Sequence, residues 1–342
     1  DAIGNEAFKE CTALDSVDVA FGVTEIEAEA FFGCTSLAQV NMPDSITRIG
    51  AHAFGNCSAL RTLRLPKSLV QLESFAFGGS ALEEIEIPKS LESGGSAFIN
   101  TQLRNVTFEE GTTRIADWLF SSCASLRKIV IPDTVTVIEE YAFNHCEKLG
   151  DIVFPDSLRT IENAAFNGCI SLQSVILPEH LQTIGEQAFY GCSWLTSVFL
   201  PDTVTEIGRG AFADTDLAQV RLPRQLVTMG DGVFSGTPIT AVEIPKSVVN
   251  GGGAFGGMDH LKTVTFEAGT LRVADSLFKG CTSLEEIIIP DTVASVERYA
   301  FQGCSRLKRV VFPDSVTRIA DYAFSNCQAL TSVTLPNRLP SV

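Results

Sequence analysis

Short stretches of alternating apolar and polar residues recur along the whole chain. In one of them, Leu63 and Leu65 flank Arg64, and Pro66 follows directly. Alternation with a period of two predicts a short strand with one buried face, and proline ends such a strand because it has no N–H to donate. The chain is therefore predicted to contain many short strands of this kind.

A phenylalanine follows each strand, at intervals of 21 to 23 residues. Ala53 and Phe54 lie four and five residues after Ile49, a spacing that predicts one turn of helix facing inward. A single coil of this length cannot bury both faces, whereas stacked coils can. The pattern predicts one curved solenoid of about fifteen coils, with one parallel sheet and short helical turns on the opposite side. The repeated residues are Phe8, Phe31, Phe54, Phe77, Phe98, Phe120, Phe143, Phe166, Phe189, Phe212, Phe234, Phe255, Phe278, Phe301 and Phe324.

Each coil carries the same short motifs. Residues 142–146 read Ala-Phe-Asn-His-Cys, and residues 126–132 read Leu-Arg-Lys-Ile-Val-Ile-Pro. These closely resemble the BspA-like, or Treponema pallidum type, leucine-rich repeats, which are marked by Ala-Phe-x-x-Cys and Leu-x-x-Ile-x-Ile-Pro. The resemblance covers nearly the whole chain, and it implies an α/β leucine-rich-repeat solenoid that takes in residues 1–342 as one domain.

The family resemblance also implies a function. Its members are surface-exposed or secreted proteins of bacteria and some protists, and their usual proposed role is adhesion. The chain is therefore expected to be a non-catalytic module at a cell surface or outside the cell, binding a host or cell-surface protein. The alternative is a structural stalk or spacer that presents another domain. No catalytic residue and no cofactor are implied, and His52, His145, His180 and His260 stand at unrelated places in their coils.

Charge narrows the range of partners. The net charge of -16 repels phosphate backbones and anionic membrane surfaces, since both require clustered Lys and Arg. Nucleic acid is therefore not expected as a partner. No apolar run is long enough to cross a membrane, and the N-terminus shows no signal-peptide pattern. Oligomeric state does not follow from these features.

The cysteines form one column, three residues after a repeat phenylalanine. Other coils place Ser, Thr or Met there, so the position favours a small or soft side chain, and buried free thiols are the preferred interpretation. Disulfides are the alternative, although parallel side-chain directions in stacked coils suit the bond poorly. Zinc is less favoured still, because its ligands normally occur in closely spaced pairs. The column consists of Cys11, Cys34, Cys57, Cys123, Cys146, Cys169, Cys192, Cys281, Cys304 and Cys327.

Pro-Asp-Ser/Thr elements such as Asp44 and Asp202 raise the question of a calcium site. Each coil offers only one carboxylate there, and Lys67 and Arg224 interrupt the series. Turn formation is the simpler interpretation, because Asp and Ser side chains bond nearby backbone amides. No metal site is predicted.

The array contains an internal duplication. Residues 128–143 and 286–301 agree at ten of sixteen positions, at an offset of 158 residues or seven coils. Two irregular coils match as well, with glycines at 94–95 and at 251–253. Inherited deletions absorbed by a glycine turn are one explanation of these coils, and a binding role is the other.

Outward positions on the strands are the most informative for function, because inward ones must be apolar in any solenoid. Between the two inward residues of each strand lies one outward residue, and four successive coils make it apolar. A contiguous apolar strip often marks a contact surface, while β propensity is the competing explanation. The predicted partner-binding residues on the sheet face are Val130, Val153, Ile176, Phe199, Ile288 and Val311.

Overall fold

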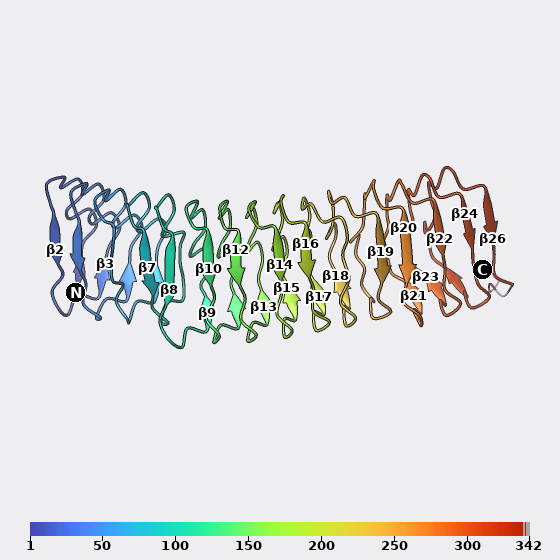
Figure 1. Ribbon diagram of the computed structural model, residues 1–342, viewed down its shortest axis with the longest axis horizontal. Coiled ribbons are helices and arrows are strands. Elements are labelled where there is room, and N and C mark those ends of the chain that lie inside the picture. Colours follow the sequence, from blue (N-terminus) through green and yellow to red (C-terminus); the bar gives the residue numbers. More distant parts are fainter. Residues whose placement is uncertain (338, 340–342) are drawn as a thin grey trace. The chain divides into compact units, whose positions relative to one another are not determined.

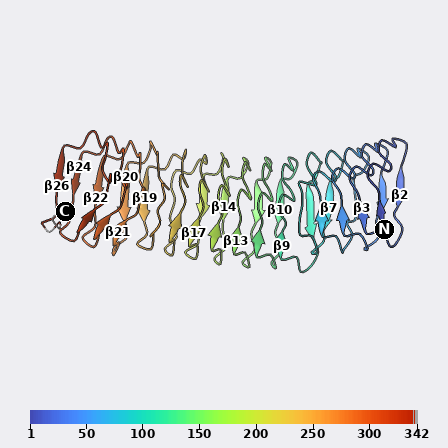
Figure 2. The same ribbon diagram turned by 180° about the vertical axis from the view of Figure 1, so that it is seen from behind.

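The computed structural model describes residues 1–337 and 339, so the last part of the predicted range, 338 and 340–342, lies outside it. The chain forms two compact units, Asp1–Leu172 and Gln173–Val342. Each unit is a stack of coils with two rows of short parallel strands (Figures 1 and 2). Strands of the two rows run in opposite directions, because each coil passes once along either side of the stack.

The first row, called here the sheet face, contains strands of three or four residues. In the first unit these are β2 (Ser16–Asp18), β4 (Gln39–Asn41), β7 (Glu84–Ile87), β8 (Asn105–Phe108), β10 (Lys128–Val130) and β12 (Asp151–Val153). In the second unit they are β14 (Ser174–Ile176), β16 (Ser197–Phe199), β19 (Ala241–Ile244), β20 (Thr263–Phe266), β22 (Glu286–Ile288), β24 (Arg309–Val311) and β26 (Ser332–Thr334).

The second row contains strands of two residues, each ending at the coil position that Ile49 occupies. In the first unit these are β1 (Ala2–Ile3), β3 (Glu25–Ile26), β5 (Arg48–Ile49), β6 (Gln71–Leu72), β9 (Arg114–Ile115), β11 (Val137–Ile138) and β13 (Thr160–Ile161). In the second unit they are β15 (Thr183–Ile184), β17 (Glu206–Ile207), β18 (Thr228–Met229), β21 (Arg272–Val273), β23 (Ser295–Val296) and β25 (Arg318–Ile319). Sequence analysis did not predict this row.

The predicted sheet face is present, but it is not one uninterrupted sheet. It consists of short parallel sheets, such as β2–β4, β7–β8 and β22–β24–β26, in which equivalent residues of successive coils pair in register. An isolated parallel bridge joins Arg64 to Glu86 where the coil has no full strand. The in-register pairing is favoured because any slip of one residue would move the apolar side chains to the solvent face.

The prediction of short helical turns is wrong, since the described residues contain no helix. After β5 the chain makes consecutive β-turns instead. Ala53 N–H donates to Gly50 at 3.2 Å within its own coil, whereas Phe54 N–H donates to Ala76 of the next coil at 2.7 Å. His52 between them has a φ of 53°. In a helix every amide N–H would donate to a carbonyl of the same coil. Here alternate amides donate to carbonyls of the neighbouring coil, so hydrogen bonds between coils take the place of the helical ones. Accordingly, no described segment is a helix able to span a bilayer.

The repeat phenylalanines form the core behind the sheet face. In the first unit neighbouring rings stack nearly parallel, with centroids 5.1 to 6.1 Å apart. Twelve of them, from Phe31 to Phe278, are among the largest fully buried side chains. Such stacked rings contribute packing energy beyond the apolar area that they bury, so this column stabilises the contact between coils.

The cysteine column lies beside the rings, and all ten cysteines are free. Nine are buried, and Cys57 and Cys146 donate their thiol hydrogens to the carbonyl oxygens of Phe31 and Phe120, at 3.3 and 3.0 Å. Cys11 is exposed, which contradicts the expectation of a fully buried column. It belongs to the first coil of the described residues.

Coils with threonine in this column bond differently. Thr101 and Thr237 donate to the phenylalanine carbonyl of their own coil, at 2.7 Å in both cases, whereas the thiols donate to the coil before. A threonine hydroxyl therefore closes the turn locally in these coils, which also have the shorter loop.

Alkylation should separate Cys11 from the rest of the column. Burial raises the pKa of Cys57, Cys146 and Cys281 to about 12, so these thiols stay protonated and unreactive near neutral pH. We expect iodoacetamide to modify one thiol rapidly in the native protein and all ten in denaturant without reductant. Mass spectrometry counts the adducts. Fewer than ten adducts in denaturant would show that disulfides exist.

Candidate functional site

The sheet face presents two outward columns in each unit. One is the column predicted above, with Val130 and Val153 as examples. The other lies two residues earlier on each strand, at positions such as Lys128 and Asp151. Sequence analysis missed this second column, although the period of two that identified the first also identifies it.

In the first unit, the predicted apolar residues lie side by side on β10 and β12. Val130 pairs in register with Val153, and the side chains are 55% and 50% exposed. On the second outward column, Lys128 and Asp151 form an exposed ion pair at 3.0 Å. The two valines thus lie beside charges that already neutralise each other. A partner can cover this surface without burying an unpaired charge.

Two further apolar pairs lie in the second unit. On β14 and β16, Ile176 pairs with Phe199, and they are 77% and 44% exposed. On β22 and β24, Ile288 pairs with Val311, and they are 74% and 41% exposed. Exposed apolar surface of this size has an unfavourable free energy of hydration, and burial against a partner would remove it. Whether they bind a partner stays a prediction.

A shallow groove of about 380 Å³ surrounds the pair on β22 and β24. Ile288 and Val311 line it together with the charged side chains of Glu286, Asp291 and Arg309. The groove therefore combines an apolar centre with a charged rim, as protein contact surfaces do.

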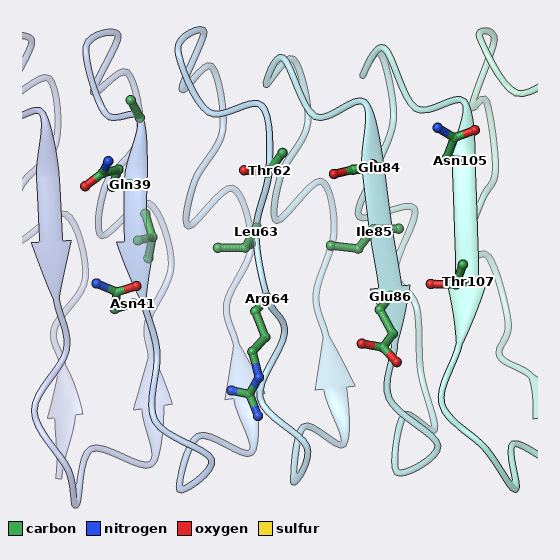
Figure 3. A pocket seen from close by; sticks show the side chains of 12 residues that line it. Gln39, Asn41, Thr62, Leu63, Arg64, Glu84, Ile85, Glu86, Asn105 and Thr107 are labelled. Atoms are coloured by element: carbon green, nitrogen blue, oxygen red, sulfur yellow. The ribbon is translucent and has the colours of Figure 1, made fainter.

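The sheet face of the first unit is polar over β4, β7 and β8, and a groove of about 770 Å³ runs across it (Figure 3). Gln39, Thr62, Glu84 and Asn105 form one rank of outward side chains and Asn41, Arg64, Glu86 and Thr107 form the other. Leu63 and Ile85 lie between the ranks. The groove offers many hydrogen-bonding groups beside the apolar side chains of Val40, Leu63 and Ile85.

Three aspartates of the Pro-Asp elements, Asp44, Asp202 and Asp314, accept a backbone N–H of the next coil. Asp44 accepts the backbone N–H of Lys67 at 2.9 Å, one coil further on, and Arg64 donates to both carboxylate oxygens of Asp44 at 2.8 and 3.1 Å. The amide and the guanidinium hold the pKa of Asp44 below its usual range. The predicted role in turns is therefore wrong in detail, since these bonds join two coils rather than close one turn.

The hydroxyls of the same elements also reach another coil. Ser45 donates to the carbonyl of Val23 at 2.7 Å, and Ser157 donates to that of Val135 at 2.6 Å. With the aspartate occupied by amides of the next coil, the side chains at this turn serve stacking. Within residues 1–337 and 339, no group of three or more His, Cys, Asp or Glu side chains is arranged to hold a metal ion.

The glycine-rich coils have a structural explanation. A Cβ on Gly94 would lie 2.4 Å from the Cα of Leu119, and one on Gly95 would lie 2.6 Å from the carbonyl oxygen of Leu72. Gly95 also has a φ of 53°. In the second unit, a Cβ on Gly252 would lie 2.8 Å from the carbonyl oxygen of Met229. Both coils therefore require glycine so that the backbone can approach its neighbours.

Comparison with known proteins identifies the repeat. The family model of the BspA type leucine rich repeat region matches residues 1–127, 113–240 and 227–342. A crystal structure of a leucine-rich repeat protein from Bacteroides ovatus is 28% identical, with a TM-score of 0.66, over 99% of this chain and 83% of that chain. A comparison with curated proteins finds no match.

Two other solved structures are similar at the level of sequence. A leucine rich cell surface protein from Faecalibacterium prausnitzii is 26% identical, covering 97% of this chain and 88% of that chain with a TM-score of 0.45. The T. pallidum leucine rich repeat protein is 29% identical, covering 60% of this chain and 78% of that chain with a TM-score of 0.39. Since the family model matches the whole length of the sequence, the chain belongs to the BspA type leucine-rich-repeat family.

Proposed function

We propose that the chain is a non-catalytic protein-binding module of the adhesion type, acting at a cell surface or outside the cell, and that the sheet face is its contact surface. The observation that carries the proposal is the set of exposed apolar pairs on neighbouring strands of that face. Membership in the BspA type family supports it, because repeat solenoids bind partners along extended surfaces of this kind.

The pair on β14 and β16 offers the largest side chain for a partner. Covering apolar surface yields about 25 cal/mol per Å², and aromatic residues supply most of the binding energy in protein interfaces. Phe199 is held in register beside Ile176, so its position is set by the strand before any partner arrives. Because the side chain is already positioned, binding costs little conformational entropy. Much of the free energy gained by burying its apolar area would therefore contribute to affinity.

The test begins with peptides selected from a phage-displayed library of random dodecapeptides on the native protein. We expect Phe199→Ser to weaken the binding of a selected peptide by about 1–3 kcal/mol, because an exposed aromatic contact is lost. Stability should change by only about 0.5 kcal/mol, since an outward side chain fills no core cavity. Isothermal titration and a thermal melt measure the two quantities.

Tyr322→Ser is the matched control. Tyr322 is an exposed aromatic residue, 58% accessible, in the turn segment that follows β25 and not on the sheet face. We expect this variant to bind the same peptides as the native protein does. If peptides bind Phe199→Ser and Ile288→Ser unchanged, the apolar pairs are only strand-forming surfaces, and the spacer function is the better description.

A further inference from the structure

One small hollow occurs at equivalent places in both units, and we call it the charged hollow. Its volume is about 80 Å³ in the first unit and about 260 Å³ in the second. Two cationic and two anionic side chains surround an apolar floor made by a leucine and a proline. The six positions are Arg64, Leu65, Lys67, Glu86, Pro88 and Glu109 in the first unit, and Arg221, Leu222, Arg224, Glu243, Pro245 and Glu267 in the second.

The same hydrogen bonds hold both copies. Arg221 donates to both carboxylate oxygens of Asp202 at 2.7 and 2.9 Å, as Arg64 does to those of Asp44. The backbone N–H of Lys246 donates to Glu267 at 3.0 Å, and the ammonium of Lys246 lies 3.4 Å from the same carboxylate. Arg221 and Glu267 are thus fixed in position and largely neutralised by their partners.

The equivalent contacts in the first unit involve Lys89 and Glu109. The backbone N–H of Lys89 donates to Glu109 at 3.1 Å, and the ammonium lies 3.8 Å away. Gly111, with a φ of 85°, turns the chain beneath the aliphatic stem of Lys89. Gly269 holds the corresponding place beside Lys246 with a φ of 89°. One side of the charged hollow is therefore formed by Glu109 in the first unit and by Glu267 in the second.

Two opposite charges in each copy make no hydrogen bond or ion pair with their side chains. Within the described residues these are Lys67 and Glu86 in the first unit and Arg224 and Glu243 in the second. All four are exposed. Lys67 and Arg224 still lie close enough to Asp44 and Asp202 to help lower the pKa of those carboxyls. Each charged hollow thus presents at its edge one cation and one anion that lack a direct ion pair, and a ligand that carries both signs would contact the two together.

The two copies have kept this arrangement while several other exposed charges of the same coils have changed. Four exposed charged positions of the first unit are uncharged in the second, namely Arg61 against Ala218, Glu83 against Thr240, Glu84 against Ala241 and Glu92 against Val249. Three further exposed charges are also matched, namely Lys89 by Lys246, Arg104 by Lys262 and Arg114 by Arg272. The charged hollow keeps the sign of charge at every one of its positions. Exposed ion pairs contribute only about 0–1 kcal/mol to folding, and unpaired charges contribute less, so stability gives little reason for the retention of all four charges.

We propose that each charged hollow binds a segment of a protein partner in which an acidic and a basic side chain lie close together, so that one chain takes two such segments. The inference rests on the proposed protein-binding function and names the chemistry of the partner. The acidic group of the ligand faces Lys67 or Arg224, and the basic group faces Glu86 or Glu243. Two equivalent sites on one chain favour a partner that repeats its binding segment, because a second contact then becomes intramolecular.

Charge-exchange variants of the full chain test the proposal. Dodecapeptides selected as above are synthesised, and their stoichiometry is measured by isothermal titration. We expect peptides with an acidic and a basic residue at fixed spacing to bind with a stoichiometry close to two, and to weaken as salt rises. The double variant Lys67→Glu/Glu86→Lys should reduce the stoichiometry to one. Adding Arg224→Glu/Glu243→Lys should weaken the remaining binding by about tenfold or more.

A reversed peptide supplies the decisive control. A peptide with its acidic and basic residues exchanged should recover binding to the four-residue variant, which a merely damaged surface would not allow. Arg61→Glu, an exposed charge outside the charged hollow, should change nothing. If binding peptides lose affinity with Phe199→Ser but keep it with the charge-exchange variants, the sheet face binds partners and the charged hollow does not. If peptides of mixed charge bind once per chain, the proposal of two sites is overturned.

Discussion

Phe143→Ala is expected to lower the free energy of unfolding by about 3–5 kcal/mol, because it leaves a cavity in a close-packed column. Phe143 is fully buried, and its ring stacks on Phe120 and Phe166 at centroid distances of 5.4 and 5.2 Å. Truncation therefore removes packing on both sides at once. In a repeat array, stability is a sum of coil and interface terms, so the loss falls on two interfaces. Urea denaturation followed by circular dichroism measures it.

Phe143→Leu is the control for this effect. It keeps most of the apolar volume while losing the stacked geometry, so we expect a cost of about 1.5 kcal/mol or less. A loss for Phe143→Ala no larger than that of Phe143→Leu would mean that the column can collapse around the cavity. The contribution of the ring stack to the contact between coils would then be small.

Gly95→Val should cost about 3 kcal/mol of stability, for two separate reasons. The left-handed backbone at Gly95 is unfavourable for a β-branched residue, at about 1–2 kcal/mol. The new Cβ would also lie 2.6 Å from the carbonyl oxygen of Leu72 and 2.7 Å from the carbonyl carbon of Glu73, so the coils must move apart. Overpacking of this kind typically costs about 1–3 kcal/mol. Chemical denaturation compared with the native protein gives the sum.

Gly22→Val separates the two causes. Gly22 has a φ of 96°, yet nothing lies within 4 Å of a Cβ placed on it. This variant therefore suffers the backbone strain without the clash, and we expect it to be the milder of the two. Equal losses for both variants would show that the approach to Leu72 and Glu73 is not tight in solution.

The sequence by itself determined the repeat, the row of strands on the sheet face and the column of buried rings. Inward positions such as Phe54, Ala53 and Leu65 must be apolar in every coil, so their period could be read directly. The same period separated inward from outward positions, and the structure leaves all six predicted apolar residues of the sheet face exposed. Their role in binding remains a prediction, because exposure alone does not name a partner.

The tertiary structure decided how the coils bond one another. The inward pair Ala53 and Phe54 suits a helical turn and a pair of β-turns equally well, and only the amide of Phe54 reaching Ala76 excludes the helix. In the same way, Asp44 could bond its own turn or the amide of Lys67. The sequence records which groups are polar, but not which of two equally near partners they meet.

The charged hollow shows the same division. Arg64 and Glu86 share one outward position of successive coils, whereas Lys67 and Glu109 stand elsewhere in theirs, so no single motif marks the hollow. Only stacking brings Arg64, Glu86 and Glu109 to one edge. The exposure of Cys11 likewise does not follow from its own motif, which matches that of the buried cysteines. Local pattern thus determined the coil, whereas contacts between coils, made by groups about 22 residues apart, decided the turns and the surface they create.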